Sequence, residues 1–398
     1  MLKEDRYSSL REYFATGLRT WIGRGLAIGL CLLGGTIRTD SASSSTTEVE
    51  AAGSLYFPPS HGQWEQVDLP SVGWNAEKLN DVFAFASENR SSGLVMLYKG
   101  RILAERYWDS ESDENGAGDR KSGYFQMRQG RDQAGHVIED VASIQKSISA
   151  VLVGIAQTKG LLRLDDPVDK YLGKGWSRAS PGQEKAITIR HLITMTTGLG
   201  DDLTYEAPSG TKWRYNSAVY ARVIHVVAAA AKMKPNELTG KWLTEPIGMN
   251  DSRWIDRTGA PEPLRVNPIG FATTARDLAR FGLLILADGQ WDDKTVVADR
   301  EYLHAALRPS QEFNPAYGYL WWLNREGTRA RASNGIGNRP LIHSAPPDLV
   351  AAIGAGEHRL YIVPSLSLVV TRLGYPAKPG FDNGLWQRLM RAAPKRPR

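Results

Sequence analysis

The sequence holds a single cysteine, Cys31, among its 398 residues. One thiol cannot form an internal disulfide or supply a cysteine-based metal cluster, so both kinds of framework are excluded. Several signature motifs are missing as well: the Gly-x-Ser-x-Gly elbow, His-Glu-x-x-His, the phosphate-binding loop and a complete dinucleotide fingerprint. These absences argue against a zinc peptidase, a nucleotide hydrolase and a dinucleotide-dependent enzyme. We therefore expect neither a metal nor a cofactor.

Long apolar stretches are also scarce. Residues 25–37 (GLAIGLCLLGGTI) are too few for a comfortable membrane span, but they follow a net-basic segment and precede small polar residues, as in a signal peptide. We expect residues 1–40 to be a signal peptide or N-terminal anchor, residues 41–55 to be a linker, and the protein to be periplasmic or extracellular. A mobile N-terminal helix on a cytoplasmic protein is the alternative. A lipid anchor on Cys31 is disfavoured because the bulky Leu30 precedes it.

Charge of one sign is not concentrated in the body of the chain. The 49 basic and 43 acidic residues give a net charge of +6, and part of the excess lies at the two termini. Without a basic helix face or an arginine-rich run, a nucleic-acid partner is not expected. A small-molecule substrate is expected instead, with membrane contact only through the leader. The hydrophobic fraction of 42% is typical of a globular protein with a sizeable core.

Strand-like patterns lie towards both ends of the chain. Residues 93–108 (GLVMLYKGRILAERYW) predict a hairpin that turns at Lys99 and Gly100. The polar segment 109–135 predicts a surface loop. Near the C-terminus, β-branched and aromatic runs predict four more strands and a closing helix, at 317–323, 350–353, 359–363, 368–373 and 385–392.

Helical patterns fill the middle of the chain. Residues 143–160 predict a helix, and most patterns from there to about residue 307 have helical periodicity. Strands at both ends with helices between them predict one sheet built from the two chain ends, into which a mostly helical subdomain at about 160–307 is inserted. The expected fold class is α+β, with one folded domain over residues 56–398.

A lysine interrupts the apolar part of the first predicted helix, SIQKSISAVLVGIA at residues 143–156. Apolar residues at i, i+4, i+7 and i+8 indicate that this helix packs deeply, and Ser143 and Lys146 occupy neighbouring positions on one side. Burial disfavours a charged amine and lowers its pKa from about 10.4, so that it can accept a proton from a hydroxyl. Ser143 is therefore a candidate nucleophile, with its own N–H as an oxyanion donor.

The Ser-x-x-Lys pattern is short, and about one copy per chain of this size arises by chance. Ser209-Gly-Thr-Lys212 is a second copy. It follows Pro208, contains Gly210 and opens no apolar helix, so it lacks a setting that would lower the pKa of its lysine. Ser143 is the better candidate of the two.

A second group of polar residues stands just ahead of an apolar helix in KWRYNSAVYARVIHVV, residues 212–227. It contains Tyr215, Asn216 and Ser217. The order of a Ser-x-x-Lys motif, a Tyr-x-Asn-like triplet and a Gly-bearing strand near the C-terminus resembles the β-lactamase and penicillin-binding serine hydrolases. The resemblance is to their class C and esterase branch in particular.

Further segments are similar to later landmarks of that branch, at 188–199, 246–254, 270–282 and 353–374. The opening YFPP at Tyr56, with GWNAEKL from Gly73, is most similar to sequences called 6-aminohexanoate-dimer hydrolases. The resemblance covers about residues 56–374. It implies the β-lactamase/DD-peptidase-like fold, in which helices flank an antiparallel sheet.

The resemblance also implies a role for three residues. Ser143 would be the acylated nucleophile, and Lys146 its proton acceptor or the group that lowers the pKa of the tyrosine. Tyr215 would pass the proton to the leaving group and later activate the deacylating water. The division of the proton between Lys146 and Tyr215 is a coupled titration that the sequence leaves open.

The tyrosine triplet departs from the family pattern at its third residue. Ser217 stands where asparagine is usual, and Asn216 stands one place earlier. Both are candidate contacts to the substrate, because a hydroxyl can still hydrogen-bond Lys146 or the substrate, though with fewer groups than an amide.

A second departure lies in the Lys-Thr-Gly strand, which aligns with Ala352, Ile353 and Gly354. The cation and the hydroxyl are both missing, so nothing at Ala352 could hold the carboxylate of a penicillin or of a peptide terminus. Gly354 would keep the strand edge open, and the N–H of Ala355 would be the second oxyanion donor. The departure favours an esterase or amidase over a β-lactamase or D-Ala-D-Ala peptidase.

Weaker predictions concern four histidines and two tryptophans. His191 and His225 fall in amphipathic helices and are expected to pack or face solvent. His343 and His358 lie near the predicted sheet edge and are candidate substrate contacts. In a strand the two tryptophans at 321 and 322 would point to opposite faces, one to the core and one to a cleft.

The sequence thus predicts a serine hydrolase of the esterase or 6-aminohexanoate-oligomer amidase type, which cleaves an ester or amide through an acyl-enzyme on Ser143. A class C β-lactamase or D-Ala-D-Ala peptidase-like enzyme is one alternative. A non-catalytic binding protein on the same fold is another. The presence of Ser143, Lys146 and Tyr215 together speaks against a binding protein, which has no chemical reason to keep all three.

Overall fold

The computed structural model describes residues 55–109, 127–257, 267–325 and 339–394. All of them belong to one compact unit, Ala52–Arg398. The predicted leader and nearly all of the predicted linker lie outside the described residues, as does most of the predicted loop 109–135. Within the described ranges, no helix has both the length and the apolar character needed to cross a membrane.

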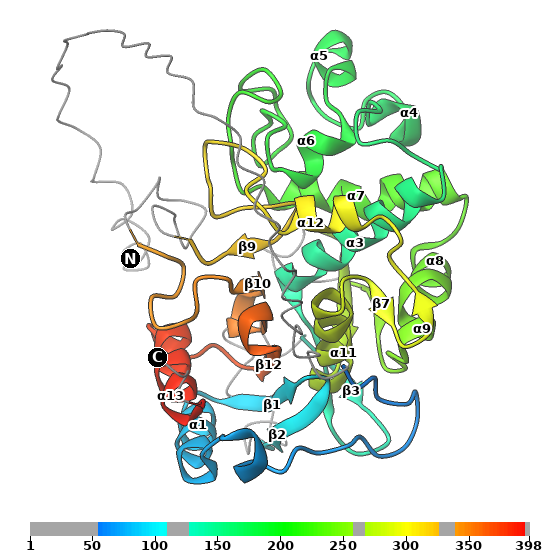
Figure 1. The fold of residues 1–398 in the computed structure, drawn as a ribbon. Helices are drawn as coiled ribbons and strands as arrows, with labels where there is room; N and C mark the ends of the chain where they lie inside the picture. Colours follow the sequence, from blue (N-terminus) through cyan, green and yellow to red (C-terminus); the bar gives the residue numbers. More distant parts are fainter. Residues whose placement is uncertain (1–54, 110–126, 258–266, 326–338, 395–398) are drawn as a thin grey trace, which may run out of the picture. The chain divides into compact units, whose positions relative to one another are not determined.

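A six-stranded sheet joins the two ends of the unit. Its strand order is β2-β1-β12-β11-β10-β9, and every neighbouring pair is antiparallel. The strands are β1 (Ser91–Tyr98), β2 (Arg101–Tyr107), β9 (Trp322–Leu323), β10 (Val350–Ile353), β11 (Arg359–Val363) and β12 (Leu368–Gly374). The predicted hairpin turns at Lys99 and Gly100, both with positive φ. The predicted sheet from both chain ends is confirmed (Figure 1).

Helices cover both faces of this sheet: α1 (Ala76–Glu88), α11 (Ala275–Leu286) and α13 (Phe381–Ala392). Alternate residues of β11 show the two faces, because successive side chains of a strand point in opposite directions. Tyr361 contacts Trp386 of α13, with ring centroids 5.5 Å apart. Its neighbour Leu360 lies against Gly282 of α11. Helix α13 therefore packs on one face and α11 on the other (Figure 1).

A four-stranded sheet of order β3-β4-β6-β5 supports the nucleophile turn, residues 141–144, which holds the predicted nucleophile Ser143. Its strands are β3 (Arg128–Arg131), β4 (Val137–Asp140), β5 (Arg253–Asp256) and β6 (Ile269–Thr273), and a separate small hairpin pairs β7 (Gln290–Trp291) with β8 (Lys294–Thr295). Strand β3 lies in the segment predicted to be a surface loop. That prediction was wrong there because the strand, RQGR, has no apolar residue and is held by pairing with β4.

Two other boundaries differ from the prediction. The strand expected over 317–323 is reduced to β9, because Leu320 adopts φ 61° and its N–H donates to Ile193 O, which takes the backbone off the strand path. Helix α13 begins at Phe381 rather than at 385. Gly380 takes φ 84° at the helix start, and the buried Phe381 stacks on Phe85 of α1.

The predicted helix over 143–160 is confirmed as a short turn, η4 (Ala142–Ile144), followed by α3 (Gln145–Thr158). The other helices of the described residues are α4 (Asp169–Leu172), α5 (Pro181–Lys185), α6 (Ile189–Ile193), α7 (Ser217–Ala231), α8 (Pro235–Thr239), α9 (Glu245–Ile247) and α12 (Arg300–Ala306). Between residues 160 and 307, most of the regular elements are helices, although fewer than half of the described residues there are helical. Strands β5 and β6 are the main interruption.

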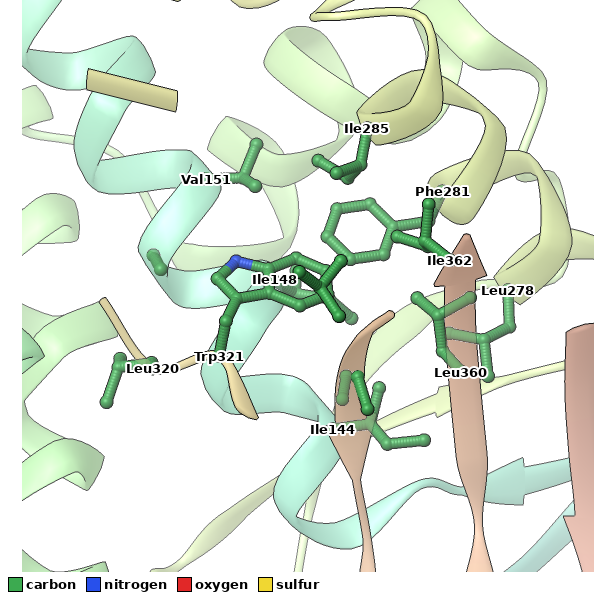
Figure 2. Close-up of a cluster of buried hydrophobic side chains, with 14 of the residues drawn as sticks. Ile144, Ile148, Val151, Leu278, Phe281, Ile285, Leu320, Trp321, Leu360 and Ile362 are labelled. Atoms are coloured by element: carbon green, nitrogen blue, oxygen red, sulfur yellow. The ribbon is translucent and has the colours of Figure 1, made fainter. Parts of the chain in front are cut away.

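Helix α3 is buried on every side, from Gln145 to Ala156. A helix surrounded in this way belongs to the interior of a large core. Figure 2 shows why: side chains from η4 and α3 meet side chains from α11, from β11 and from the segment before β9. Trp321 lies among them and stacks on Phe281, with ring centroids 5.9 Å apart. The core thus fixes the start of α3 relative to the large sheet.

Gly282 offers a test of the packing between α11 and the sheet. A Cβ at this position would lie 2.5 Å from Val369 Cγ1 and 2.6 Å from Leu360 Cδ1, which is too close. We expect Gly282→Ala to lower the free energy of unfolding by about 1–3 kcal/mol through overpacking, although alanine is the better helix former. Urea denaturation measures the difference.

The matched control is Gly182→Ala in α5, where a Cβ would meet nothing within 4 Å. This substitution should leave stability unchanged or raise it slightly. If both substitutions had the same effect on the urea midpoint, the close packing of α11 on the sheet would be disproved.

Candidate active site

Ser143 lies in a turn between a strand and a helix. Strand β4 ends at Asp140, the turn follows, and α3 begins at Gln145. Ala142 adopts φ 49°, which residues other than glycine rarely take, and its N–H donates to Asp140 Oδ1 at 2.9 Å. Backbone strain of this kind is concentrated at functional sites. The turn leaves Ser143 half-buried between buried neighbours.

The Lys146 amine lies against the Ser143 hydroxyl, with 2.7 Å between Nζ and Oγ. Lys146 is only 2% exposed. Its Nζ lies 3.5 Å from the ring centroid of Tyr220 and 4.6 Å from that of Tyr215. Burial lowers the pKa of Lys146 well below its ordinary value, and the charge of Arg257 lowers it further.

Two effects on this amine oppose each other. The faces of the two tyrosine rings attract a cation, which is worth about 2 kcal/mol at a desolvated position. Burial disfavours a charged lysine by up to about 4–7 kcal/mol. Burial is the larger effect, so it favours the neutral form of the amine, which can accept a proton from the adjacent hydroxyl.

Tyr215 is the third predicted residue that the fold brings to this place. Burial raises the pKa of Tyr215, and hydrogen bonding with Ser143 acts in the opposite direction. The ring stacks on Trp322, with centroids 5.7 Å apart, and meets Tyr317 edge-on at 6.2 Å. The phenol therefore keeps its proton and is held in one orientation. Trp322 lines the site while Trp321 packs in the core, as the alternation of the strand predicts.

A buried polar network beneath the turn was not predicted. Arg257 donates two hydrogen bonds to Asp140, both of 2.7 Å, and a third to Gln145 Oε1 at 3.2 Å. The Gln145 amide donates to the Tyr220 hydroxyl at 3.1 Å, and the Asn267 amide donates to the same hydroxyl at 2.5 Å. Burial raises the pKa of Tyr220 to about 12. The network fixes the ring that covers Lys146 and places Arg257 near the amine.

The signals for this network in the sequence were weak. Tyr220 lies in the apolar stretch 212–227, where the helical pattern predicts only that it packs on one face of a helix. Asp140 directly precedes the nucleophile turn, but Arg257 and Asn267 flank residues 258–266 and belong to no motif. Their proximity depends on the pairing of β4, β5 and β6.

The structure gives Asn216 a different role from the predicted substrate contact. It is 1% exposed, its Oδ1 accepts from Val219 N–H at the start of α7, and its amide donates to Leu199 O and Gly200 O. The side-chain amide of Asn216 therefore joins the segment at Leu199 and Gly200 to the start of α7. Ser217 is half-buried, and its hydroxyl has no hydrogen bond to Lys146 in the described structure.

Gly354 brings the large sheet close to the nucleophile turn. A Cβ at this position would lie 2.3 Å from Val141 O, so only glycine permits the approach. The Gly354 N–H donates to His358 O at 2.9 Å and closes a tight turn. Ala355, in this turn, is exposed. The predicted second oxyanion donor therefore belongs to a segment that packs beside the residues just before Ser143.

His358, named above only as a candidate substrate contact, has a structural role instead. It is fully buried, and its Nε2 lies 2.7 Å from Glu139 Oε2. Burial alone would raise the pKa of Glu139, but hydrogen bonding and charge from His358 lower it overall. Glu139 Oε2 also accepts from Gly374 N–H at 3.0 Å. The pair ties the turn after β10 to strand β4, whereas His343 is exposed.

The second Ser-x-x-Lys copy has none of this geometry. Ser209 Oγ donates to Ala186 O at 3.0 Å, and the exposed Lys212 pairs with Glu206 at 3.0 Å. His191 caps the start of α6 through Thr188, and His225 is half-buried on α7. The preference for Ser143 over Ser209 agrees with these contacts.

Comparisons with known proteins agree with this geometry. The family model described as Beta-lactamase matches residues 84–391. An uncharacterized protein of Alkalihalophilus pseudofirmus is 25% identical over 325 residues, which cover 76% of this chain and 88% of that protein. Esterase EstB of Burkholderia gladioli is 36% identical over 192 residues, 37% of this chain and 48% of that protein. The match to the esterase thus spans less than half of its length.

A solved structure gives the same result at the level of the fold. The putative 6-aminohexanoate-dimer hydrolase from Bacillus anthracis superposes with a TM-score of 0.56 at 15% identity, covering 85% of this chain and 86% of that one. At this identity the likeness concerns the fold alone. It confirms the predicted α+β fold.

The charge of Arg257 provides a test of the Lys146 environment. Arg257→Gln removes a cation that lowers the pKa of Lys146, so that pKa should rise and less neutral amine should be present at pH 7. We expect slower modification of Ser143 by a fluorophosphonate at pH 7, and a rate profile shifted to higher pH. Peptide mapping of the modified serine against pH measures both.

Arg257→Lys keeps the charge and should leave the profile closer to that of the parent protein. Arg257→Gln also leaves Asp140 buried without its ion-pair partner, which costs about 3–5 kcal/mol. The double substitution Asp140→Asn with Arg257→Gln avoids this cost and serves if the single variant unfolds. An unshifted profile in a folded variant would show that Arg257 does not act on Lys146.

Proposed function

This chain belongs to the beta-lactamase family of serine hydrolases, and from that premise we propose that it cleaves an ester or amide through an acyl-enzyme on Ser143. One observation carries the proposal: the Lys146 amine, buried and with a lowered pKa, lies 2.7 Å from the Ser143 hydroxyl. A nucleophile next to a neutral base is the requirement for covalent acyl transfer.

Acylation begins with attack of Ser143 Oγ on the carbonyl carbon of the substrate, while the Oγ proton passes to Lys146 Nζ. The carbonyl π electrons move to oxygen, and the resulting oxyanion accepts hydrogen bonds from the N–H groups of Ser143 and Ala355. Tyr215 then gives its phenolic proton to the leaving oxygen or nitrogen as the bond to carbon breaks. Lys146 returns a proton to Tyr215, and the acyl-enzyme remains.

Deacylation runs through the same groups in reverse. A water molecule attacks the acyl carbonyl and loses a proton to Lys146, and Lys146 gives this proton to Ser143 Oγ as the bond between Oγ and the acyl carbon breaks. The assignment of Lys146 as base and Tyr215 as acid rests on the direction of each pKa, because burial lowers the pKa of the amine and raises that of the phenol. Burial thus favours, in each group, the protonation state that its role requires.

The substrate class follows from what surrounds the serine. Ala352, at the position where relatives carry a lysine, is 2% exposed in β10 and has no charge to offer. The half-buried Tyr215 packs against the aromatic rings of Tyr317 and Trp322, so the surroundings of the phenol are aromatic. These features favour a simple carboxylic ester or a linear amide over a penicillin. The names of Esterase EstB and of the putative 6-aminohexanoate-dimer hydrolase agree with this choice.

Ser143→Ala tests the nucleophile. We expect the variant to lose turnover of a p-nitrophenyl ester by on the order of a thousandfold or more, because the attacking oxygen is gone, and to lose labelling by a fluorophosphonate. Ser209→Ala, in the second Ser-x-x-Lys copy, is the matched control and should retain both properties.

A chromogenic cephalosporin tested alongside the ester decides between the enzyme classes. Cephalosporin turnover faster than ester turnover would overturn the esterase or amidase proposal in favour of a penicillin-recognising enzyme. A protein that turned over neither compound and was not labelled at Ser143 would be a binding protein instead.

Tyr215→Phe tests the proposed proton donor. The phenylalanine ring keeps the stacking on Trp322, while the hydroxyl is lost. An ethyl ester needs its leaving oxygen protonated, whereas p-nitrophenolate leaves without help. We therefore expect kcat to fall by on the order of a hundredfold for the ethyl ester and far less for the p-nitrophenyl ester.

Tyr220→Phe makes the same chemical change on the other ring beside Lys146. Its hydroxyl bonds Gln145 and Asn267, so this variant should affect both esters equally. Equal losses for the two esters in Tyr215→Phe would remove Tyr215 from the leaving-group step.

A further inference from the structure

A polar cleft of about 480 Å³ lies around the first turns of α7. It is lined by residues 175–178 and 201–203 and by Ala218, Arg222 and Pro268. Part of the wall is apolar, including Trp176 and Leu203, and four charged side chains line another part: Arg178, Asp201, Asp202 and Arg222. The cleft is large enough to enclose part of a small substrate.

The cleft is connected to the site through its neighbours in the chain. Ala218 directly follows Ser217 at the start of α7. Pro268 lies between Asn267, which donates to the Tyr220 hydroxyl, and Ile269, whose carbonyl accepts from Gln145 Nε2 at 3.1 Å. The wall of the cleft and the support of Lys146 are therefore built from the same segments.

Most of the charges in the cleft are matched. Asp201 pairs with Arg214 at 2.7 Å. Asp202 accepts from the N–H and hydroxyl of Thr204 at 3.1 and 2.6 Å, and Arg178 lies 3.5 Å from it. Each aspartate thus has a cation among its contacts.

Arg222 is the exception among the charged residues of the cleft. It is half-buried on α7, and it has no ion pair or hydrogen bond with any residue that the structure describes. Burial lowers its pKa, but a guanidinium stays charged at neutral pH. His225 nearby adds no second cation, because burial and the charge of Arg222 lower the pKa of His225. A lone guanidinium at the wall of a cleft is suited to a planar anion.

We propose that this cleft receives a carboxylate carried on the acyl chain of the substrate, and that Arg222 binds it through paired N–H donors. The proposal rests on the proposed function and names its substrate class: esters or amides of linear dicarboxylic acids. Ala218 and Arg222 share one face of α7 and are about 6 Å apart along its axis. The carboxylate must therefore be several bonds away from the carbonyl attacked by Ser143, and the intervening methylene groups would lie along Trp176 and Leu203.

Three p-nitrophenyl esters with acyl chains of equal length test the proposal: the neutral hexanoate, the adipate monoester with a terminal carboxylate, and the 6-aminohexanoate with a terminal ammonium. We expect kcat/KM for the adipate monoester to exceed that for the hexanoate by about tenfold or more, because only the carboxylate of the adipate monoester can form a charge-assisted hydrogen-bonded pair with Arg222. The preference should shrink in concentrated salt.

In Arg222→Gln, the ratio of kcat/KM for the adipate monoester to kcat/KM for the hexanoate should fall towards one. Arg222→Met keeps an apolar side chain of similar length and should do the same, which provides a second variant if the first is poorly folded. Arg308→Gln removes the same charge from an exposed residue outside the cleft and should keep the ratio of the parent protein. Thermal melting of each variant confirms that it is folded.

A parent protein without preference for the adipate monoester would overturn the proposal, and so would a preference that survives in both Arg222 variants. A preference for the aminohexanoate ester would show that the aspartates, rather than Arg222, set the charge of the substrate. Hydrolysis of the hexanoate that depends on Ser143 but lacks any charge preference would refute only this inference. Loss of Ser143-dependent hydrolysis altogether would refute the proposed function itself.

Discussion

The exclusion of water from the Lys146 amine is the constraint on which the site depends. The amine has the Ser143 hydroxyl at one end and two tyrosine rings beside it. A solvated lysine would keep its proton at neutral pH and could not accept another. The surrounding core is therefore a chemical requirement of the proposed mechanism as well as a source of stability, because burial in the core lowers the pKa of the amine.

The rest of the structure holds this arrangement in place from several directions. The ion pair of Arg257 with Asp140 lies beneath the turn, and the pair of His358 with Glu139 joins the turn after β10 to strand β4. Both acidic residues come from one short strand that leads directly into Ser143. The strained Ala142 backbone persists because these contacts and the pairing of β4 with β6 fix the chain on both sides.

Much of this could be predicted from the sequence, for identifiable reasons. The hairpin at Lys99 and Gly100 and the buried helix after Ser143 follow from local periodicity, and the sheet from both chain ends follows from the order of the patterns. The proximity of Ser143, Lys146 and Tyr215 required the family resemblance, because Tyr215 is far from the other two in the chain. Spacing along the sequence carries no information about such distant contacts.

The errors have physical causes. Strand β3 has no apolar residue, so its pairing with β4 leaves no periodic signal. His358 and Asn216 are polar residues next to functional ones, and polarity alone does not distinguish a substrate contact from a buried structural hydrogen bond. Arg257 was missed because its effect on Lys146 acts through space between strands that only the fold brings together.

The pairing of β1 with β12 determines when the large sheet can form. Strands β1 and β12 lie near opposite ends of the described chain, so the hairpin of β1 and β2 keeps an unpaired edge until β12 has been synthesised. Such distant pairing makes folding slow and leaves apolar surface exposed in the meantime. Because Gly354 directly follows β10 of the same sheet, the segment that packs beside the turn of Ser143 reaches its final place only once β12 has joined that sheet.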